Sequence, residues 1–361
     1  MRAMTFSSYI NAYTIYKGVE SVGISFATAD EKPVLPIPIH PSVSQEDWLF
    51  YTEEASLRRA LIGELVGHYL PRNFPLPLLD DKWALAEWLA ANPSLCQGLK
   101  QWKLCDTLVV FPCLVKSKHS WQNQEKLPRG WICRNGSDLQ SALALITREG
   151  YAPEAFFIQE WLGDGPCRVI SVCGFHDTHD QTRNLVAVVE RIAAHTEGLS
   201  CSSAVETIPD EWGLIDQTKA ILDALSFVGP YEMEFLVVGD RVLVLELNPR
   251  FWMQHAIFLV AGNGLIKRYL NLETENDLQQ RIIQNIVWID GIHLVKCVMH
   301  FKVNDVRLVL NKCLIEGKQV VIWPSLRVSS FYWISQVWRK RGALGLKLLR
   351  LVNLSKSITT L

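Results

Sequence analysis

Residues 228–261 read VGPYEMEFLVVGDRVLVLELNPRFWMQHAIFLVA, and this stretch decides the fold. Two runs rich in Val, Leu and Phe flank Gly239-Asp240, which is typical of a β-hairpin. Glu234 and Glu246 lie an even number of residues apart, so a symmetric pairing of the strands requires a loop of odd length. A three-residue loop, Gly239-Asp240-Arg241, with Gly as a bulge residue, would place Glu234 directly opposite Glu246.

In this register the two faces of the hairpin differ, because side chains alternate along a strand. One face is wholly apolar and would pack against a core; it carries Tyr231, Met233, Phe235, Val237, Leu243, Leu245 and Leu247. The other face is apolar near the turn and acidic at the open end; it carries Leu236, Val238, Val242 and Val244, then Glu232, Glu234, Glu246 and Asn248.

The acidic end of the hairpin has the composition of a metal site. Carboxylates one strand spacing apart repel each other unless a cation lies between them, and carboxylate and amide oxygens are ligands that suit Mg²⁺. Glu234, Glu246 and Asn248 are therefore candidate metal ligands. With the usual two-residue turn the two glutamates would lie on opposite faces, and the hairpin would be an ordinary one with solvated acids. The hairpin by itself leaves these two alternatives open.

The sequence ELNPRFWMQH, which follows a strand carrying MEF, resembles the metal-binding end of the ATP-grasp superfamily. The resemblance is greatest to its carbamoyl-phosphate synthase and biotin carboxylase-like branches. There, an acid on one strand and Glu-x-Asn-x-Arg on the next hold Mg²⁺ against the phosphates of ATP. The matching residues are Glu234, Glu246, Asn248 and Arg250. The resemblance covers about residues 79–265 and implies ATP and Mg²⁺ as cofactors, with Mn²⁺ as an alternative metal.

The resemblance also implies a fold and a domain order. The fold is α/β, of the α+β ATP-grasp type, with two subdomains that sandwich ATP and a short Rossmann-like α/β domain before them. We expect an abbreviated α/β domain at 1–78, the ligase domain at 79–265 and a basic, partly helical extension at 266–361. In the first domain we expect a helix at 7–17, a strand at 19–26, a helix over 44–69 and a first strand that is barely present.

Composition narrows the class of protein. A chain of 361 residues with 49% hydrophobic and 20% charged residues is globular and can bury a sizeable core. The net charge of −1 argues against nucleic acid as a main partner. The charge is unevenly spread: residues 317–361 contain eight Lys or Arg and no Asp or Glu, so the remainder carries −9.

The cysteines and the N-terminus predict a cytoplasmic protein. The nine cysteines form no CxxC pair and no zinc-like spacing, which favours reduced thiols. The first residues lack the apolar core of a signal peptide, and no run of about 20 apolar residues predicts a membrane span. The composition gives no indication of the oligomeric state.

Two lysines are candidates for holding phosphates. Lys82 follows Asp80 and Asp81 at the start of an amphipathic helix, where acids are suited to cap the helix. Lys116 ends an apolar strand predicted at 108–115, and a lysine there provides a point charge for the α and β phosphates. The alternative for each is a lysine that reaches solvent. The loop 117–130, which covers the phosphates in the family, is usually glycine-rich but here has one glycine, at its end.

The remaining nucleotide contacts come from the resemblance. Gln159, Glu160 and Leu162 match the hinge between the two subdomains and would line the adenine site, although an edge strand with one exposed acid explains them equally well. Arg191, at the end of a strand predicted at 185–192, matches a basic position that faces phosphate. His255 and Gln254, beyond the metal residues, are candidates for a supporting role.

The function that follows is an ATP- and Mg²⁺-dependent ligase acting on a small-molecule carboxylate and an amine. Lys116 and Arg250 would be the catalytic cations, with Arg250 stabilising charge on the transferred phosphoryl group while the substrate carboxylate becomes an acyl phosphate. The glycine-poor loop favours an alternative, a nucleotide-binding scaffold without turnover. The basic amphipathic stretch 331–354 favours another, a ligase at the inner membrane face that modifies a polysaccharide or lipid-linked substrate.

Overall fold

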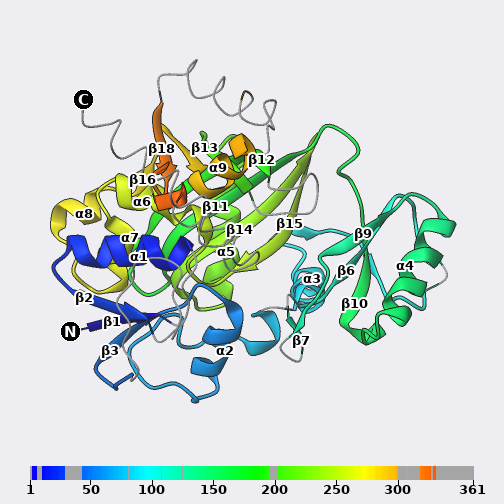
Figure 1. The fold of residues 1–361 in the computed structure, drawn as a ribbon, viewed down its shortest axis with the longest axis horizontal. Helices are drawn as coiled ribbons and strands as arrows, with labels where there is room; N and C mark the ends of the chain where they lie inside the picture. The colour runs from blue at the N-terminus through cyan, green and yellow to red at the C-terminus, as the bar shows by residue number, and fades with distance from the viewer. Residues whose placement is uncertain are drawn as a thin grey trace, which may run out of the picture.

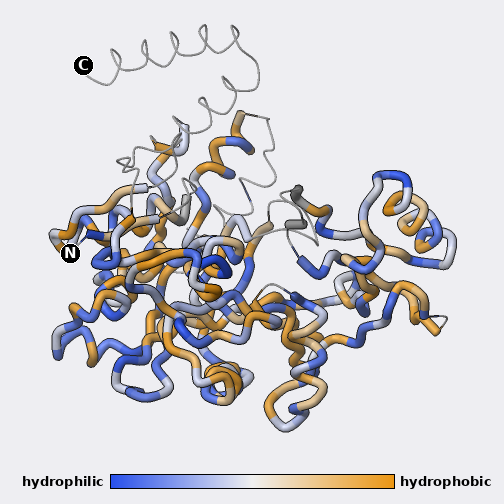
Figure 2. Tube along the Cα trace, turned by 90° about the horizontal axis from the view of Figure 1, so that it is seen from below, coloured by the Kyte–Doolittle hydropathy of each residue, from blue (hydrophilic) through white to orange (hydrophobic). Residues whose placement is uncertain are grey.

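The computed structural model, drawn in Figure 1, describes most of the chain and contains three main sheets. In Figures 1 and 2 a four-stranded sheet with one helix forms a lobe at the side of a larger body, and the N-terminal strands lie at the other end of that body. The described residues are 2–5, 10–28, 43–79, 81–106, 108–119, 121–122, 125–194, 202–299, 307, 318–326 and 328–330.

The N-terminal residues form a small parallel sheet with the order β2-β1-β3. The first strand, which we expected to be barely present, is complete and pairs with both neighbours. The helix predicted over 44–69 is wrong, because a strand and a shorter helix occupy that range. The elements are β1 (Arg2–Thr5), α1 (Ile10–Ser21), β2 (Ser25–Thr28), β3 (Asp47–Phe50) and α2 (Glu54–Leu61).

The strand β3 was missed because it is buried on both faces. Leu49 packs with one core cluster and Phe50 with another, and both side chains are fully buried. A strand covered on both sides is a continuous apolar run without the alternation that identifies a half-buried strand.

The side lobe is an antiparallel sheet with the order β5-β10-β6-β9, covered by one helix. Asn135 caps that helix by accepting a hydrogen bond from the Asp138 backbone N–H at 3.0 Å. The strand predicted at 108–115 begins later, after Pro112, and Leu108 and Val110 are exposed. The elements are β5 (Gln101–Trp102), β6 (Cys113–Ser117), β7 (Trp121–Gln122), β8 (Glu125–Lys126), β9 (Gly130–Cys133), α4 (Gly136–Arg148), η2 (Pro153–Ala155) and β10 (Phe156–Glu160).

The central sheet has the order β18-β17-β13-β12-β11-β14-β15-β4, with β16 beside β12. Its strands are β4 (Gln97–Gly98), β11 (Arg168–Asp177), β12 (Leu185–Ala194), β13 (Ser202–Thr207), β14 (Val228–Val238), β15 (Arg241–Asn248), β16 (Ile282–Ile283), β17 (Ile286–Asp290) and β18 (Gln319–Trp323). The helical segments around it are η1 (Leu76–Leu78), α3 (Lys82–Ala91), η3 (Gln181–Arg183), α5 (Leu214–Ala224), η4 (Met253–His255), α6 (Ala256–Val260), α7 (Gly264–Tyr269), α8 (Glu275–Gln279) and α9 (Gly291–Met299).

Helices cover both faces of this sheet. Residues of α3 and α5 join one core cluster, together with Met233 and Phe235 of β14. Residues of α1, α6 and α7 join the other, together with Cys173 of β11 and Trp288 of β17.

The β14–β15 hairpin has the pairing predicted at its open end, but a different turn. Glu234 lies opposite Glu246, and Glu232 lies opposite Asn248. The strands are joined by two residues, Gly239-Asp240, with Gly239 in the left-handed region at φ 56°. The predicted three-residue loop is therefore wrong. The odd residue is supplied by a β-bulge, because Phe235 pairs with Val244 while Glu234 pairs with Glu246.

The bulge changes which side chains face the core. Tyr231, Met233, Phe235, Val237 and Leu247 lie in the α5-side core as predicted, but Val244 joins them. Leu243 and Leu245, which we expected on that face, pack instead with Leu236 on the face that carries the acids. Along β15, the bulge shifts by one residue which side chains face the core. An assignment that assumes strict alternation along the whole strand therefore puts Leu243 and Leu245 on the wrong face.

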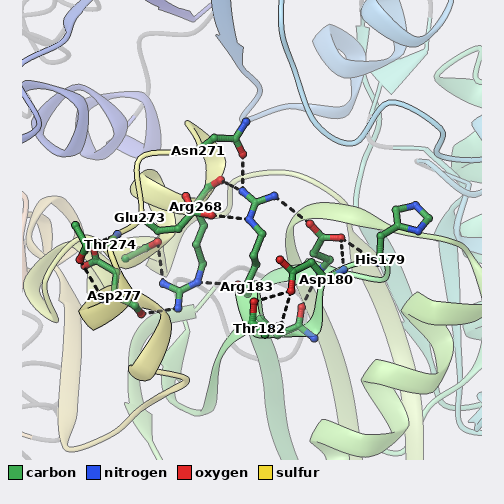
Figure 3. A network of polar contacts seen from close by, with 12 residues as sticks. His179, Asp180, Thr182, Arg183, Arg268, Asn271, Glu273, Thr274 and Asp277 are labelled. Atoms are coloured by element: carbon green, nitrogen blue, oxygen red, sulfur yellow. Dashed lines mark hydrogen bonds and ion pairs between the residues drawn. The ribbon is translucent and has the colours of Figure 1, made fainter.

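A buried arginine ties α7 and α8 to the β11–β12 hairpin (Figure 3). Arg268 is fully buried and donates to the backbone carbonyls of Arg183, Gly264, Asp277 and Gln280. Arg183 in turn forms ion pairs with Asp177 and Glu273. The polar loop at 176–181 is thus part of a structural network.

Two further predictions concern the basic C-terminal stretch and membrane-spanning segments. The basic stretch 331–354 lies outside the described residues. Among the residues that the structure describes, none belongs to a helix long and apolar enough to cross a membrane. The cysteines at 96, 105, 113, 133, 167, 173 and 297 are free thiols.

Candidate functional site

The acidic end of the β14–β15 hairpin brings two carboxylates face to face. Glu234 and Glu246 are paired across the ladder, where opposed side chains start about 5 Å apart. Each carboxylate has a cation beside it. Arg191 Nη2 lies 3.3 Å from Glu234 Oε2, and Lys82 Nζ lies 3.6 Å from Glu246 Oε1. The protein's own cations therefore offset the repulsion between the two glutamates.

Asn248 lies on the same face, between the carboxyl group of Glu232 and the guanidinium of Arg250. Its Nδ2 donates to Glu232 Oε2 at 3.1 Å, and its Oδ1 accepts from Arg250 Nη2 at 3.2 Å. Arg250 also donates from Nε to Glu54 Oε1 at 2.7 Å. Because Glu54 is the first residue of α2, the N-terminal unit contributes a residue to this site.

Lys116, a residue of the side lobe, lies close enough to Glu234 and Glu246 for its charge to act on both. It lies on β6, which is held to α3 because the Lys82 backbone N–H donates to the Lys118 carbonyl at 3.1 Å. The pKa of Lys116 is lowered to about 8, chiefly by burial and also by the charges of Lys82 and Arg129, against the opposing effect of Glu246 and Glu234. A lysine in such a position gains most from an anion that replaces its lost hydration.

The three glutamates differ in their ionisation. The pKa of Glu232 is raised to about 8, chiefly by burial and also by the neighbouring charge of Glu234. Burial also raises the pKa of Glu234, because it outweighs the Arg191 charge. Burial would raise the pKa of Glu246 as well, but the charges of Lys82, Lys116 and Arg250 together lower it. The charged forms of Glu232 and Glu234 are thus penalised chiefly by lost hydration, which a bound cation would replace.

The residues present fit a hard divalent metal. Glu232 Oε1 is buried and has no hydrogen-bond partner among the described residues. The described residues contain no group of three His, Cys, Asp or Glu that could by itself hold a metal ion. The predicted set uses two carboxylates and an amide oxygen, which suits Mg²⁺ with water in its remaining positions. The cations now beside Glu234 and Glu246 would have to turn away as the metal binds.

The hinge residues lie at the junction of the lobe and the central sheet. Glu160 Oε2 lies 3.4 Å from Arg241 Nη2, and Leu162 packs with Leu236 and Leu243 on the acid-bearing face of the hairpin. Gln159 is buried and pairs with Leu114 of β6. The backbone N–H groups of Glu160 and Trp161 already donate to the carbonyls of Lys100 and Pro112. Because Leu162, Leu236 and Leu243 pack together there, the part of this hairpin face next to the acids is apolar.

Sequence reasoning missed two charged residues of the site. Arg129 directly precedes Gly130 at the end of the loop 117–130, and its charge acts on Lys116, Glu234 and Glu246. Glu54 meets Arg250 across 196 residues of chain. An arginine beside the one glycine of the phosphate-loop region was a usable signal for the first, whereas the sequence around Glu54 held none for the second.

No family model matches this chain, and no curated protein matches it. Solved structures match it well in fold at low sequence identity. One is carboxyaminoimidazole ribonucleotide synthase from Aspergillus clavatus complexed with ATP, at 13% identity and a TM-score of 0.55, covering 79% of this chain and 80% of that one. Another is biotin carboxylase from Campylobacter jejuni, at 13% identity and a TM-score of 0.55, covering 76% and 73%.

A third match is the biotin carboxylase domain of 2-oxoglutarate carboxylase from Hydrogenobacter thermophilus, in complex with MgADP, ADP and bicarbonate. It has 11% identity and a TM-score of 0.54, and the alignment covers 76% of this chain and 71% of that one. Identities this low show a shared fold and leave substrates open. The chain therefore has the ATP-grasp fold.

Proposed function

We propose that the protein is an ATP- and Mg²⁺-dependent ligase that activates a substrate carboxylate as an acyl phosphate and joins it to an amine. The observation that carries this proposal is the pairing of Glu234 with Glu246, with Asn248 on the same face and Lys82 and Arg191 beside the two acids. The similar structures support it at the level of the reaction class, since they are solved with ATP or with MgADP.

Different residues would bind the metal, the phosphates and the base of the nucleotide. Glu234, Glu246 and Asn248 would hold Mg²⁺, which when bound neutralises the β and γ phosphates. Lys82 and Arg191, released from the glutamates by the metal, would turn to phosphate oxygens, together with Lys116. The base would lie against the apolar patch of Leu162, Leu236 and Leu243. Because the Glu160 and Trp161 N–H groups are engaged, the base would use the Leu162 amide or nearby carbonyls.

The chemistry at the other end of the site involves Arg250. A substrate carboxylate oxygen would attack the γ phosphorus, the bond from that phosphorus to the bridging oxygen would break, and ADP would leave. An amine would then displace inorganic phosphate from the acyl phosphate and lose a proton, which leaves an amide. Arg250, held by Glu54 at 2.7 Å, is placed to stabilise the charge on the transferring group.

A second candidate function is nucleotide binding without turnover. It is favoured by the loop 117–130, whose one glycine is Gly130. A loop with few glycines brings fewer backbone N–H groups close to the phosphates. The two candidates share the ATP site and differ in the release of ADP.

Calorimetry of ATP binding, with and without Mg²⁺, tests the proposal. The wild type is compared with Glu246→Ala combined with Asn248→Ala, and with the control Glu211→Ala, whose side chain is 61% exposed. Mg²⁺-dependent binding that the double variant loses and the control keeps supports the metal site. Binding that ignores Mg²⁺ and survives the double substitution refutes it. ADP release that requires a carboxylate and an amine together then separates the ligase from the scaffold.

A further inference from the structure

Glu232 is a third carboxylate at the open end of the hairpin, outside the ligand set described above. Glu232 is 4% exposed, and it lies directly opposite Asn248 in the β14–β15 ladder. Burying a carboxyl costs free energy because the group loses its hydration, so packing alone gives no reason for an acid at this place. The contacts of Glu232 point to a specific role.

The hydrogen bonds around Asn248 fix the orientation of its amide. Asn248 Nδ2 donates to Glu232 Oε2 at 3.1 Å, and Arg250 Nη2 donates to Asn248 Oδ1 at 3.2 Å. A guanidinium can only donate, so Arg250 must face the amide oxygen of Asn248. Glu232 Oε2 then accepts from the NH₂ group on the other side of the amide. With the amide flipped, the NH₂ group would face the guanidinium and the hydrogen bond to Arg250 would be lost.

This orientation determines which amide atom a cation can reach. A divalent metal binds the amide oxygen and is repelled by the NH₂ group. A carbonyl oxygen has two lone pairs, so Asn248 Oδ1 can accept from Arg250 and still bind a cation. Glu232 engages the NH₂ group and keeps it away from the metal.

We propose that Glu232 is a positioning residue, which holds Asn248 with its amide oxygen toward the cation and does not itself bind the metal. The inference rests on the proposed function, since it presupposes the divalent cation site. Partners that orient metal ligands typically change metal affinity by about 10- to 100-fold when they are removed.

Substitutions at 232 separate positioning from direct binding. Glu232→Gln keeps a carbonyl oxygen that can accept from Asn248 Nδ2, whereas Glu232→Leu removes the acceptor. A positioning role predicts that Gln preserves metal affinity to within about threefold and that Leu lowers it by about 10- to 100-fold. A ligand role predicts that both changes weaken binding, because both remove the charged oxygen. Cys173→Ala is a matched control, because Cys173 lies opposite Glu232 on β11 and its thiol bonds to the Ala187 carbonyl rather than to Asn248.

A double-variant comparison gives the decisive result. If Glu232 acts through Asn248, then Glu232→Leu combined with Asn248→Ala binds metal no more weakly than Asn248→Ala alone. If the losses add, Glu232 contributes independently and the inference is refuted.

The measurement is Mn²⁺ binding to the full-length protein in the presence of ATP, followed by electron paramagnetic resonance of the free ion. Circular dichroism confirms that each variant is folded, and Glu232→Met replaces Glu232→Leu if the latter unfolds. Wild-type affinity in both apolar variants overturns the inference. A wild type that binds ATP but no Mn²⁺ refutes the proposed metal site itself, so the two failures are distinguishable.

Discussion

Glu234 and Glu246 face each other across the β14–β15 ladder although only Gly239 and Asp240 separate the two strands. A two-residue turn with regular pairing would set Glu246 opposite Met233, on the core face. The extra residue in β15, Leu245, reverses the alternation just before Glu246. Bulges commonly re-aim a side chain next to a functional site, and this one brings a second carboxylate to the face that carries Glu234.

Deleting Leu245 should leave the acid pair intact. Without it, Glu246 follows Val244 and still lies opposite Glu234 in a regular ladder. We expect Mg²⁺-dependent ATP binding within about tenfold of the wild type, and a free energy of unfolding lower by about 1–3 kcal/mol because a packed leucine is lost. Deleting Val242 is the control: it also makes the ladder regular but reverses the faces of Leu243 and Val244, so it should destabilise more. Loss of binding in a folded Leu245 deletion would contradict this account.

The buried position of Lys116 predicts that ATP affinity falls in alkaline solution. Its pKa is lowered to about 8 by burial, so its charge is lost as the pH rises from 7 to 9. If the charged form binds phosphate, the dissociation constant for ATP should rise by about tenfold over this range. Lys116→Arg keeps its charge and should abolish the rise. Equal pH profiles for the two proteins, measured by calorimetry at constant Mg²⁺, would show that Lys116 does not hold the nucleotide.

His255 predicts a loss of stability in acid. Its Nδ1 bonds to the Trp252 carbonyl, its Nε2 is buried without a partner, and burial lowers its pKa to about 4. The unfolded state takes up a proton below pH 6.5 and the folded state does not, so stability is full above pH 6.5 and declines as the pH falls toward 4. The expected loss from this residue is about 2 kcal/mol between pH 7.5 and pH 5.

Urea unfolding of wild type and His255→Asn at the two pH values isolates this effect. Burial also lowers the pKa of His176, but that residue is present in both proteins and its effect cancels. The difference in stability between the proteins should therefore change by about 2 kcal/mol with pH. A constant difference would mean that His255 is protonated equally in both states.

The network in Figure 3 predicts a structural role for Arg268. Arg268→Met removes the donor from four backbone carbonyls in buried or part-buried hydrogen bonds, so the free energy of unfolding should fall by about 3 kcal/mol or more. ATP binding by the folded variant should be unchanged, because the network shares no residue with the acid cluster. Urea unfolding and calorimetry check the two parts, and a loss below about 1 kcal/mol would contradict the first.

The hairpin shows how far the sequence could lead. The spacing of Glu234 and Glu246 and the motif that follows were enough to predict the ATP-grasp fold and the pairing at the open end. The bulge could not be read, because Leu243, Val244 and Leu245 are all apolar and fit either face. The pairing was right, although the turn proposed for it was wrong.

Other features depend on contacts between distant residues. The strand β3 was hidden because both of its faces are buried, and its apolar run resembled part of a helix. The meeting of Glu54 with Arg250 follows from the docking of α2 beside the hairpin, which no local pattern encodes. The positions of Lys82 and Lys116 were easier to predict. Lys82 begins a helix and Lys116 lies near the end of a strand, and the sequence indicates both boundaries.

The ion pair between Glu54 and Arg250 has a consequence for how the protein can be divided. Arg250 is close enough to Glu246 and Glu232 to influence the pKa of both. Glu54 pairs with its guanidinium, so the charge of Arg250 is shared between Glu54 and the carboxylates of the hairpin. In a fragment that starts after α2, the whole of that charge would act on those carboxylates and would compete with a cation for them. We therefore expect such a fragment to bind a divalent cation more weakly than the full chain.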